Sequence, residues 1–349
     1  VSNSPTNGYA LTAQSGNTGG LTWAEMSTTV ALGDLTDAVT TATSNIGIGS
    51  TALDSITTGN YNVGIGDNVL TANTTASNNT AVGKDALTAN ITGAQNAAVG
   101  KGALQANTSG GENTAMGYLA LDANTTASNN TATGYKALRL NTTGTNNTSV
   151  GFQALLANTT GDANTALGKD ALVANTTGAS SVALGSLALY TNTTGSQNTA
   201  TGLGAMYLNT TGSYNTATGY TALRNNTTAN NNSAFGYRAM RETTTGASNV
   251  AMGYYALEQN TTGTNNAAFG YEALKSNTTA SSNVAVGLQS LDANTTGGSN
   301  IAVGTSALGS NTTASNNTAI GMSALGANST GASNLAIGHY AMSGNTTGS

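Results

Sequence analysis

The chain has 349 residues, of which only 7% are charged, and its formal net charge is −5. It therefore carries no basic stripe that could neutralise a row of phosphates, which argues against nucleic acid as a partner. The absence of Cys excludes a disulfide framework and a thiolate metal site. No apolar run approaches the roughly 20 residues of a membrane span, so we expect no membrane insertion.

Residues 1–44 do not repeat, and we expect an N-terminal β-module and connector there. The stretch PTNGYAL from Pro5, followed by GGLTW from Gly19, resembles the small Gly-x-x-Leu…Trp β-modules of bacteriophage tail fibres. Residues 33–37 are expected to lead into the repeats, and Leu21 and Trp23 to cover the first one. The start at Val1, without the charged and apolar regions of a signal peptide, suggests processing or truncation.

From Asn45 to the C-terminus, residues 45–349, one unit recurs every 17 residues in 18 copies without insertion or deletion, the last copy being incomplete. We number its positions 1 to 17 from Asn45 and call each copy a coil. The consensus is Asn-Thr-Ala-apolar-Gly-Tyr-x-Ala-Leu-x-x-Asn-Thr-Thr-Gly-Ser-Asn. A fixed period of this kind is the signature of a solenoid or another repeat architecture.

Position 5 is Gly in every copy, which predicts a backbone corner at positive φ or in close contact. Position 9 is always Leu or Met and position 4 is mostly apolar, and we expect these two columns to form the core. Position 3 is small in nearly all copies, as expected where another backbone approaches closely. The corner residues of the first eight copies are Gly49, Gly66, Gly83, Gly100, Gly117, Gly134, Gly151 and Gly168.

The stretch between the Gly corner and the Asn-rich turn holds only about six residues, too few for an amphipathic helix. We therefore expect two short strands per coil, each paired in parallel with its copies about 4.8 Å away. The fold class is all-β, a parallel β-solenoid or β-roll of 18 coils, roughly 85 Å long by that spacing. Because so few aliphatic residues are buried per coil, we expect further burial between chains in a closed cyclic oligomer, through the small-residue face.

The motifs NTAVG at Asn79, NVAVG at Asn283 and NIAVG at Asn300 resemble the head repeat of YadA-like trimeric adhesins. The resemblance implies a left-handed parallel β-roll assembled as a homotrimer. The chain departs from that family in its longer unit, with an extra Asn-Thr-Thr-Gly turn, and in lacking the coiled-coil stalk and membrane anchor.

Together the two resemblances suggest an extracellular fibre shaft or adhesin segment, in a virion tail fibre or a cell-surface appendage. Such a shaft would attach to a glycan or protein receptor on a host surface and to other fibre or virion components.

No catalytic constellation, cofactor site or metal site is evident, so we do not expect an enzyme. The single His, His339, stands at position 6 of an outer turn, where solvent exposure is expected. The acidic residues do not share one repeat position, and the Gly-Gly-x-Gly-x-Asp pattern of calcium-binding β-rolls is missing. The scattered acids are Asp67, Asp85, Asp122, Asp162, Asp170 and Asp292.

Position 6 carries the one aromatic column, which is a candidate binding surface for glycan or protein because Tyr offers a rigid ring and a hydroxyl. Stacking along the rod explains the same residues without a ligand. The cations nearby make the later part of the column chemically distinctive. The column residues are Tyr118, Tyr135, Tyr220, Tyr237, Tyr254 and Tyr271, and the cations are Arg224, Arg238, Arg241 and Lys275.

Two other functions remain open, an ice-binding solenoid and a purely structural matrix or sheath filament. Thr-x-Thr pairs, as on ice-binding faces, begin at Thr131, Thr199 and Thr216, but most copies lack them. Sixteen copies carry an N-glycosylation sequon at position 12, which we expect to remain bare in a phage or bacterial product. Because the last coil shows no capping features, we also expect more protein to follow it.

Overall fold

The computed structural model describes residues 9–12, 22–25, 38–41 and 44–348, and all regular structure within them is β. No helix there is long and apolar enough to cross a membrane. Two strands, β1 (Tyr9–Thr12) and β2 (Thr22–Glu25), form an antiparallel hairpin in which Leu11 pairs with Trp23. The expected lead-in at residues 33–37, and Leu21, lie outside the described residues.

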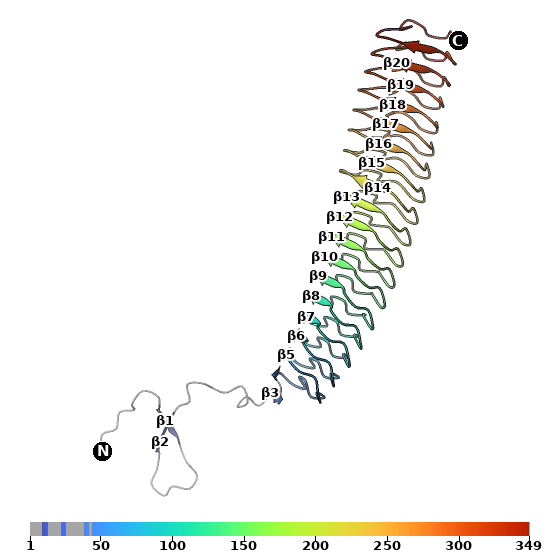
Figure 1. Cartoon of the computed structure of the whole chain (residues 1–349). Coiled ribbons are helices and arrows are strands. Elements are labelled where there is room, and N and C mark those ends of the chain that lie inside the picture. Colours follow the sequence, from blue (N-terminus) through green and yellow to red (C-terminus); the bar gives the residue numbers. More distant parts are fainter. Residues whose placement is uncertain (1–8, 13–21, 26–37, 42–43, 349) are drawn as a thin grey trace.

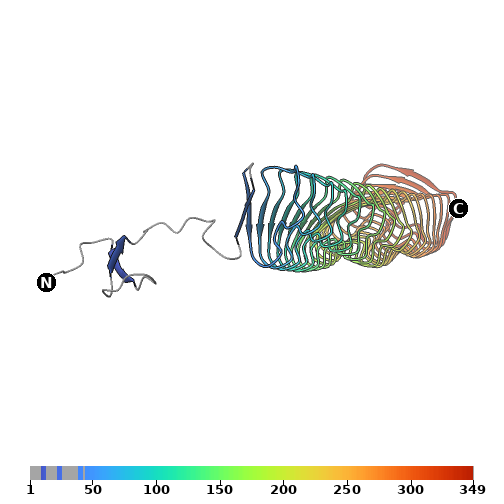
Figure 2. The ribbon, with the colours of Figure 1, turned by 90° about the horizontal axis from the view of Figure 1, so that it is seen from below.

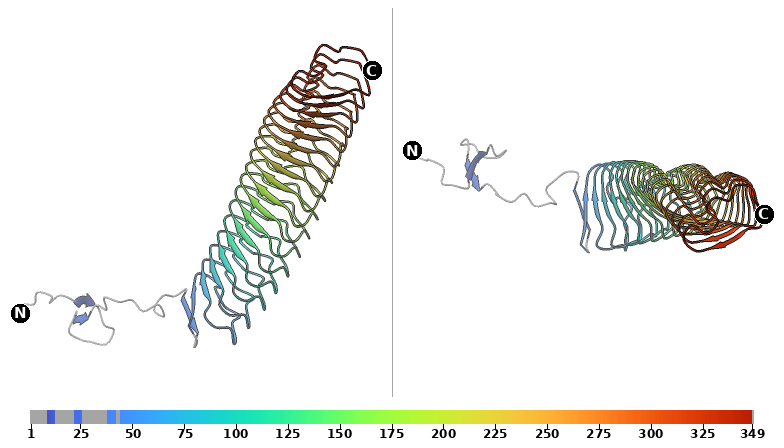
Figure 3. Two further views of the ribbon diagram at one scale, coloured as in Figure 1. Left: turned by 45° about the horizontal axis from the view of Figure 1, so that its top comes forward. Right: turned by 90° about the horizontal axis from the view of Figure 1, so that it is seen from above.

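Strands β4 to β21 form a parallel β-solenoid, one strand in each of the 18 coils, with a 17-residue repeat. Each strand pairs in register with the next copy, as Ala166 with Ala183 does. Figure 1 shows the strands stacked along one side of a rod, with the turns of every coil on the other side. Figures 2 and 3 show the coils rotating gradually about the long axis, as expected from the twist of strands.

The strands before and within the solenoid have the following bounds. They are β3 (Ala38–Thr41), β4 (Asn45–Ile48), β5 (Val63–Ile65), β6 (Thr80–Val82), β7 (Ala97–Val99), β8 (Thr114–Met116), β9 (Thr131–Thr133), β10 (Thr148–Val150), β11 (Thr165–Leu167), β12 (Val182–Leu184), β13 (Thr199–Thr201), β14 (Thr216–Thr218), β15 (Ser233–Phe235), β16 (Val250–Met252), β17 (Ala267–Phe269), β18 (Val284–Val286), β19 (Ile301–Val303), β20 (Thr318–Ile320) and β21 (Leu335–Ile337).

The first coil is covered by β3, which pairs antiparallel with β4, with Val39 opposite Gly47. The expected cover by Leu21 and Trp23 stays a prediction, because Leu21 and the side chain of Trp23 lie outside what the structure describes, while the backbone of Trp23 belongs to the β1–β2 hairpin. An extra antiparallel strand satisfies the open backbone edge that a first coil would otherwise present. The capping role is therefore carried by the last part of the N-terminal segment.

The expectation of two strands per coil was wrong, because positions 6 to 11 form a succession of turns. Positions 7 and 9 adopt positive φ, for example +55° at Asp170 and +52° at Leu172. Extended strand backbone requires negative φ, so these two residues interrupt a second strand. Position 5 is the predicted corner, with φ between +118° and +146° in all its glycines.

The core contains positions 3, 8 and 9, as Ala166, Ala171 and Leu172 show with no exposed surface. The expectation that position 4 is also core was wrong. Successive residues of a strand point to opposite faces, so a buried position 3 sends positions 2 and 4 outward, and Leu167 is 44% exposed. The small residues at position 3, which are Ala in most coils, are buried inside the chain's own core with the Leu column.

Two buried asparagine ladders run along the rod, one at position 1, which is interrupted at Ser181, and one at position 12, which is interrupted at Ile56 and Thr243. At position 12, the Asn175 amide donates to Asn158 Oδ1 (2.8 Å) in the preceding coil and to Gly178 O (2.9 Å) in its own. At position 1, Asn147 donates to Asn130 Oδ1 and to Gly161 O in the same way. The ladders satisfy the backbone of the turns without charge, which explains why Asn rather than Asp recurs.

Candidate functional site

The aromatic side chains at position 6 form two stacked ladders on the rod rather than one continuous column. In the first, Tyr118, Tyr135 and Phe152 stack with ring centroids 5.4 and 5.2 Å apart. Phe152 was not among the predicted residues, although it shares position 6. A cation lies at the end of this ladder, because Lys169 Nζ is 6.0 Å from the centroid of the Phe152 ring.

The second ladder unites the four remaining predicted tyrosines, Tyr220, Tyr237, Tyr254 and Tyr271. Successive centroids are 5.3, 5.0 and 5.3 Å apart, with the rings nearly parallel. Because the faces of the inner rings are covered by their neighbours, these rings present edges and hydroxyl groups to solvent. The ladder therefore offers a row of hydrogen-bonding groups more readily than free faces for sugar stacking.

Beside this ladder lies a cavity of about 360 Å³ built by two adjacent coils. Each coil contributes the same three positions, 6, 7 and 10, so the lining is a grid of two rows. The lining residues are Tyr220, Thr221, Arg224, Tyr237, Arg238 and Arg241. The 17-residue period alone brings these side chains together, because equal positions in neighbouring coils are about 4.8 Å apart.

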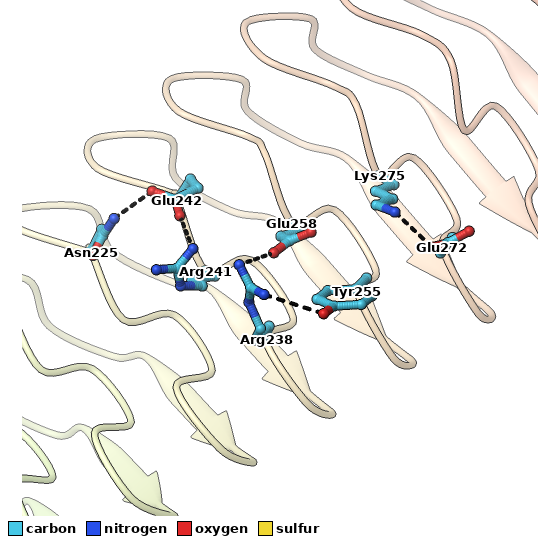
Figure 4. A network of polar contacts seen from close by, with 8 residues as sticks. All are labelled: Asn225, Arg238, Arg241, Glu242, Tyr255, Glu258, Glu272 and Lys275. Carbon is cyan, nitrogen blue, oxygen red and sulfur yellow. Dashed lines mark hydrogen bonds and ion pairs between the residues drawn. The ribbon is translucent and has the colours of Figure 1, made fainter.

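Residues of the next coil fix Arg238 in place. Its Nη2 forms an ion pair with Glu258 Oε1 at 2.8 Å, and its Nη1 donates to Tyr255 Oη at 3.2 Å (Figure 4). The guanidinium also lies 5.0 Å from the Tyr255 ring centroid. Burial raises the pKa of Glu258, against the attraction of Arg238. These contacts leave the guanidinium little freedom to rotate.

The other two arginines differ in their partners. Arg241 Nη1 forms an ion pair with Glu242 Oε1 at 2.5 Å, whereas Arg224 makes no ion pair with the residues the structure describes. Arg224 instead donates to Asn225 Oδ1 at 3.0 Å and lies 5.1 Å from the centroid of Tyr207. Of the three arginines, Arg224 is therefore the one whose charge is uncompensated.

Lys275 lies two coils after Arg241 and does not line the cavity. Its Nζ contacts Glu272 Oε1 at 2.6 Å, and Gln289 donates to the other oxygen of that carboxylate at 2.9 Å. These hydrogen bonds lower the pKa of Glu272, and the one to Lys275 raises the pKa of that ammonium group. The sequence grouped Lys275 with the arginines, but its charge is already compensated.

Tyr255 and Tyr254 form a hydrogen-bonded pair on the edge of the cluster. The hydrogen bond to Tyr255, reinforced by partial burial, raises the pKa of Tyr254 to about 12. The same bond, with help from Arg238, lowers the pKa of Tyr255. Neither Tyr255 nor Tyr207 was singled out from the sequence, because they stand at positions 7 and 10. The signal was available, since both lie in register with the arginines 17 residues away.

The remaining sequence candidates do not converge on a site. His339 is exposed and tilted against Tyr340, with centroids 4.3 Å apart. Except for Asn345 in the last coil, the sequon asparagines are buried in the position 12 ladder, as Asn175 is at 0% exposure, so the folded turns do not present them. Within the described part of the chain, no three His, Asp or Glu side chains are grouped so as to hold a metal ion.

Comparisons with known proteins found no relative: no family model, no curated protein and no solved structure matches this chain.

Proposed function

We propose that this chain is an extracellular attachment-fibre shaft or adhesin segment, in a virion tail fibre or a cell-surface appendage, and not an enzyme. In this proposal it binds a glycan or protein on a host surface and joins other fibre or virion components. Its repeats would be kin to YadA-like adhesin heads, as the Asn-x-Ala-x-Gly motifs suggest.

One observation carries the proposal: the inner positions are uniform while a contiguous block of outer positions is not. The inner position 9 column is Leu or Met in every coil, and the two inner Asn columns are interrupted only at Ile56, Ser181 and Thr243, whereas positions 6, 7 and 10 become aromatic and charged over successive coils around Arg238. Uniform inner residues serve the fold, so the local change on the surface requires another reason. Recognition of a partner supplies one, because aromatic residues and Arg are enriched at binding surfaces.

Adhesion tests this function directly. The labelled full chain should bind a panel of bacterial cells or their isolated surface polysaccharides in a saturable manner. An unrelated β-solenoid of similar length serves as the control for non-specific adsorption. If the chain adheres to no surface in the panel above that control, the attachment function is wrong.

We further propose that the shaft is a homotrimer, held together by the outer face of its sheet. Large apolar side chains at positions 2 and 4 are exposed there, between 37% and 66%, and monomers rarely expose a contiguous apolar patch above a few hundred Å². Light scattering of the full chain at micromolar concentration should give three times the mass of one chain. The exposed residues are Ile46, Ile65, Val99, Met116, Leu167, Val182, Leu184, Met252, Phe269, Val286, Ile301, Ile320, Leu335 and Ile337.

The main alternative, ice binding, is favoured by one specific observation. Position 14 is an exposed hydroxyl column, Thr in every coil except for Ser109. Regular Thr spacing is what an ice-binding face needs, and this column is far more complete than the Thr-x-Thr pairs of the strands. Thermal hysteresis with ice shaping would support this alternative over the attachment fibre. End-to-end polymerisation of the rods, without adhesion, would instead favour a structural filament.

A further inference from the structure

We propose that the cavity beside the second tyrosine ladder binds an acidic sugar, through a carboxylate or a sulfate ester on a surface glycan. The inference rests on the proposed attachment function, because it names the receptor chemistry of that same site. Four observations support it: two unsatisfied polar atoms, an uncompensated cation, the size of the cavity and the hydroxyl groups around it.

Two buried polar atoms at the cavity have no hydrogen-bond partner among the described residues, Thr221 Oγ1 and Arg238 Nε. Thr221 is 8% exposed and lines the cavity. Buried polar atoms are almost always hydrogen-bonded, so a ligand oxygen that accepts from both groups would be stabilised there. Both residues stand at position 7 of adjacent coils, and neighbouring strands of a sheet are about 4.8 Å apart. A single oxygen of an oxyanion between them can accept from the hydroxyl and from the Nε–H together.

The charge of the site favours an anion. Three guanidinium groups meet two carboxylates, those of Glu242 and Glu258, which leaves one positive charge on a chain whose net charge is −5. That charge belongs to Arg224, held beside the Tyr207 ring. The planar guanidinium group suits two-point hydrogen bonding to a carboxylate or sulfate.

The surroundings favour a sugar over a nucleic acid. The cavity, about 360 Å³, lies at the low end of the roughly 300–1,000 Å³ typical of small-molecule sites, which suits one unit of a polymer. The hydroxyl groups of Tyr220, Tyr237 and Thr221 can exchange hydrogen bonds with sugar hydroxyls. A nucleic-acid backbone would require a longer cationic track than two coils provide.

The test measures binding of the full chain to three polysaccharides: polygalacturonate, which carries carboxylates, dextran sulfate, and neutral dextran. Duplex DNA is added as a competing polyanion. Variants Arg224→Gln and Thr221→Val remove the free charge and the unsatisfied hydroxyl. The matched control is Arg139→Gln, the same residue type at the same position 10, whose partner is Asp122 at 3.4 Å. Circular dichroism and light scattering verify that each variant keeps the fold and assembly of the parent.

We expect one or both acidic polysaccharides to bind and neutral dextran not to bind. Arg224→Gln should weaken binding at least about tenfold, the loss of one charge-assisted hydrogen bond, with a smaller loss for Thr221→Val and none for Arg139→Gln. The polymer that binds identifies the anionic group.

Three outcomes overturn the inference: no acidic glycan binds, DNA binds more tightly than either, or the two Arg variants lose binding equally. If Arg224→Gln adheres to whole cells as well as the parent chain does, this site is refuted but the attachment function stands. If the parent chain itself adheres to no cells, both the site and the attachment function are refuted.

Discussion

Replacing Gly168 by Ala should destabilise its coil strongly, because position 5 combines backbone strain with a close contact. Gly168 has φ of +138°, a region that other residues avoid, and an added Cβ would lie 2.7 Å from the carbonyl carbon and oxygen of Gly185. Such strain costs about 1–3 kcal/mol, and forced overpacking adds about 1–3 kcal/mol. The sum is roughly 2–6 kcal/mol of local stability.

The same coil offers a matched control in Gly178, at position 15. An added Cβ there would also crowd Gly195 O, yet five coils carry Ala at position 15, among them Ala127 at 2% exposure. The backbone at position 15 therefore adjusts in the native rod, whereas position 5 holds nothing but Gly. Gly178→Ala should stay within about 1 kcal/mol of the parent, because Ala also restricts the unfolded chain.

Hydrogen exchange measured by mass spectrometry on peptides around residues 160–190 gives the local stability, and urea unfolding gives that of the whole rod. Local measurement matters because neighbouring coils support one another in a repeat protein. Equal protection in the two variants, or an unchanged Gly168→Ala rod, would show that the corner does not require Gly and that the reasoning from φ is wrong.

Leu167→Lys and Leu172→Asp change the same residue type in one coil. Leu167 is exposed, so its variant should dissociate the proposed trimer but keep its circular dichroism. Leu172 is buried, so its variant should lose local structure by burying an unpaired carboxylate. Light scattering and hydrogen exchange separate the two, and a trimeric Leu167→Lys rod would refute the proposed interface. Asn175→Ala should cost about 1–3 kcal/mol in urea unfolding, because its buried ladder partners lose hydrogen bonds; an unchanged midpoint would contradict that role. Tyr255→Phe should lower the pKa of Tyr254 from about 12 toward 10.0, because the neutral hydroxyl loses the acceptor that stabilises it. Ultraviolet titration of tyrosinate measures that shift, and a pKa that stays near 12 would assign it to the neighbouring rings instead.

The 17-residue period was sufficient to predict the parallel stacking, the Gly corner and the burial of position 9. Two expectations failed for physical reasons. Apolar character does not reveal which face of a strand a residue occupies, so Leu167 was assigned to the core although it points outward. The positive φ of Leu172 could not be expected either, because this conformation is unfavourable for Leu on its own. Contacts with identical coils above and below offset that cost, and one sequence copy alone does not display them.

The sequence predicted which residue types form the candidate site but not how their columns lie relative to one another. The tyrosines of position 6 stand out as one column, and the arginines stand out as a cluster. The sequence does not show that columns 6, 7 and 10 are adjacent, because this depends on the turn conformation after Gly236. Tyr255, which fixes Arg238 from the next coil, therefore went unnoticed. Equal positions meet across coils by periodicity, but different positions meet only through the path of the backbone.

The repeated backbone path explains how a repetitive rod can carry a local binding surface without a change in its fold. The buried Asn and Leu columns hold each coil in the same conformation, so the outer positions form a regular grid whose spacing does not depend on their identity. Position 7 holds Thr221, Arg238 and Tyr255 in three successive coils, all at φ between +48° and +57°. Because the backbone is unchanged by these substitutions, the side chains alone decide what the surface binds. A site built this way uses three successive coils, because two of them line the cavity and the third holds Arg238 in place through Tyr255 and Glu258.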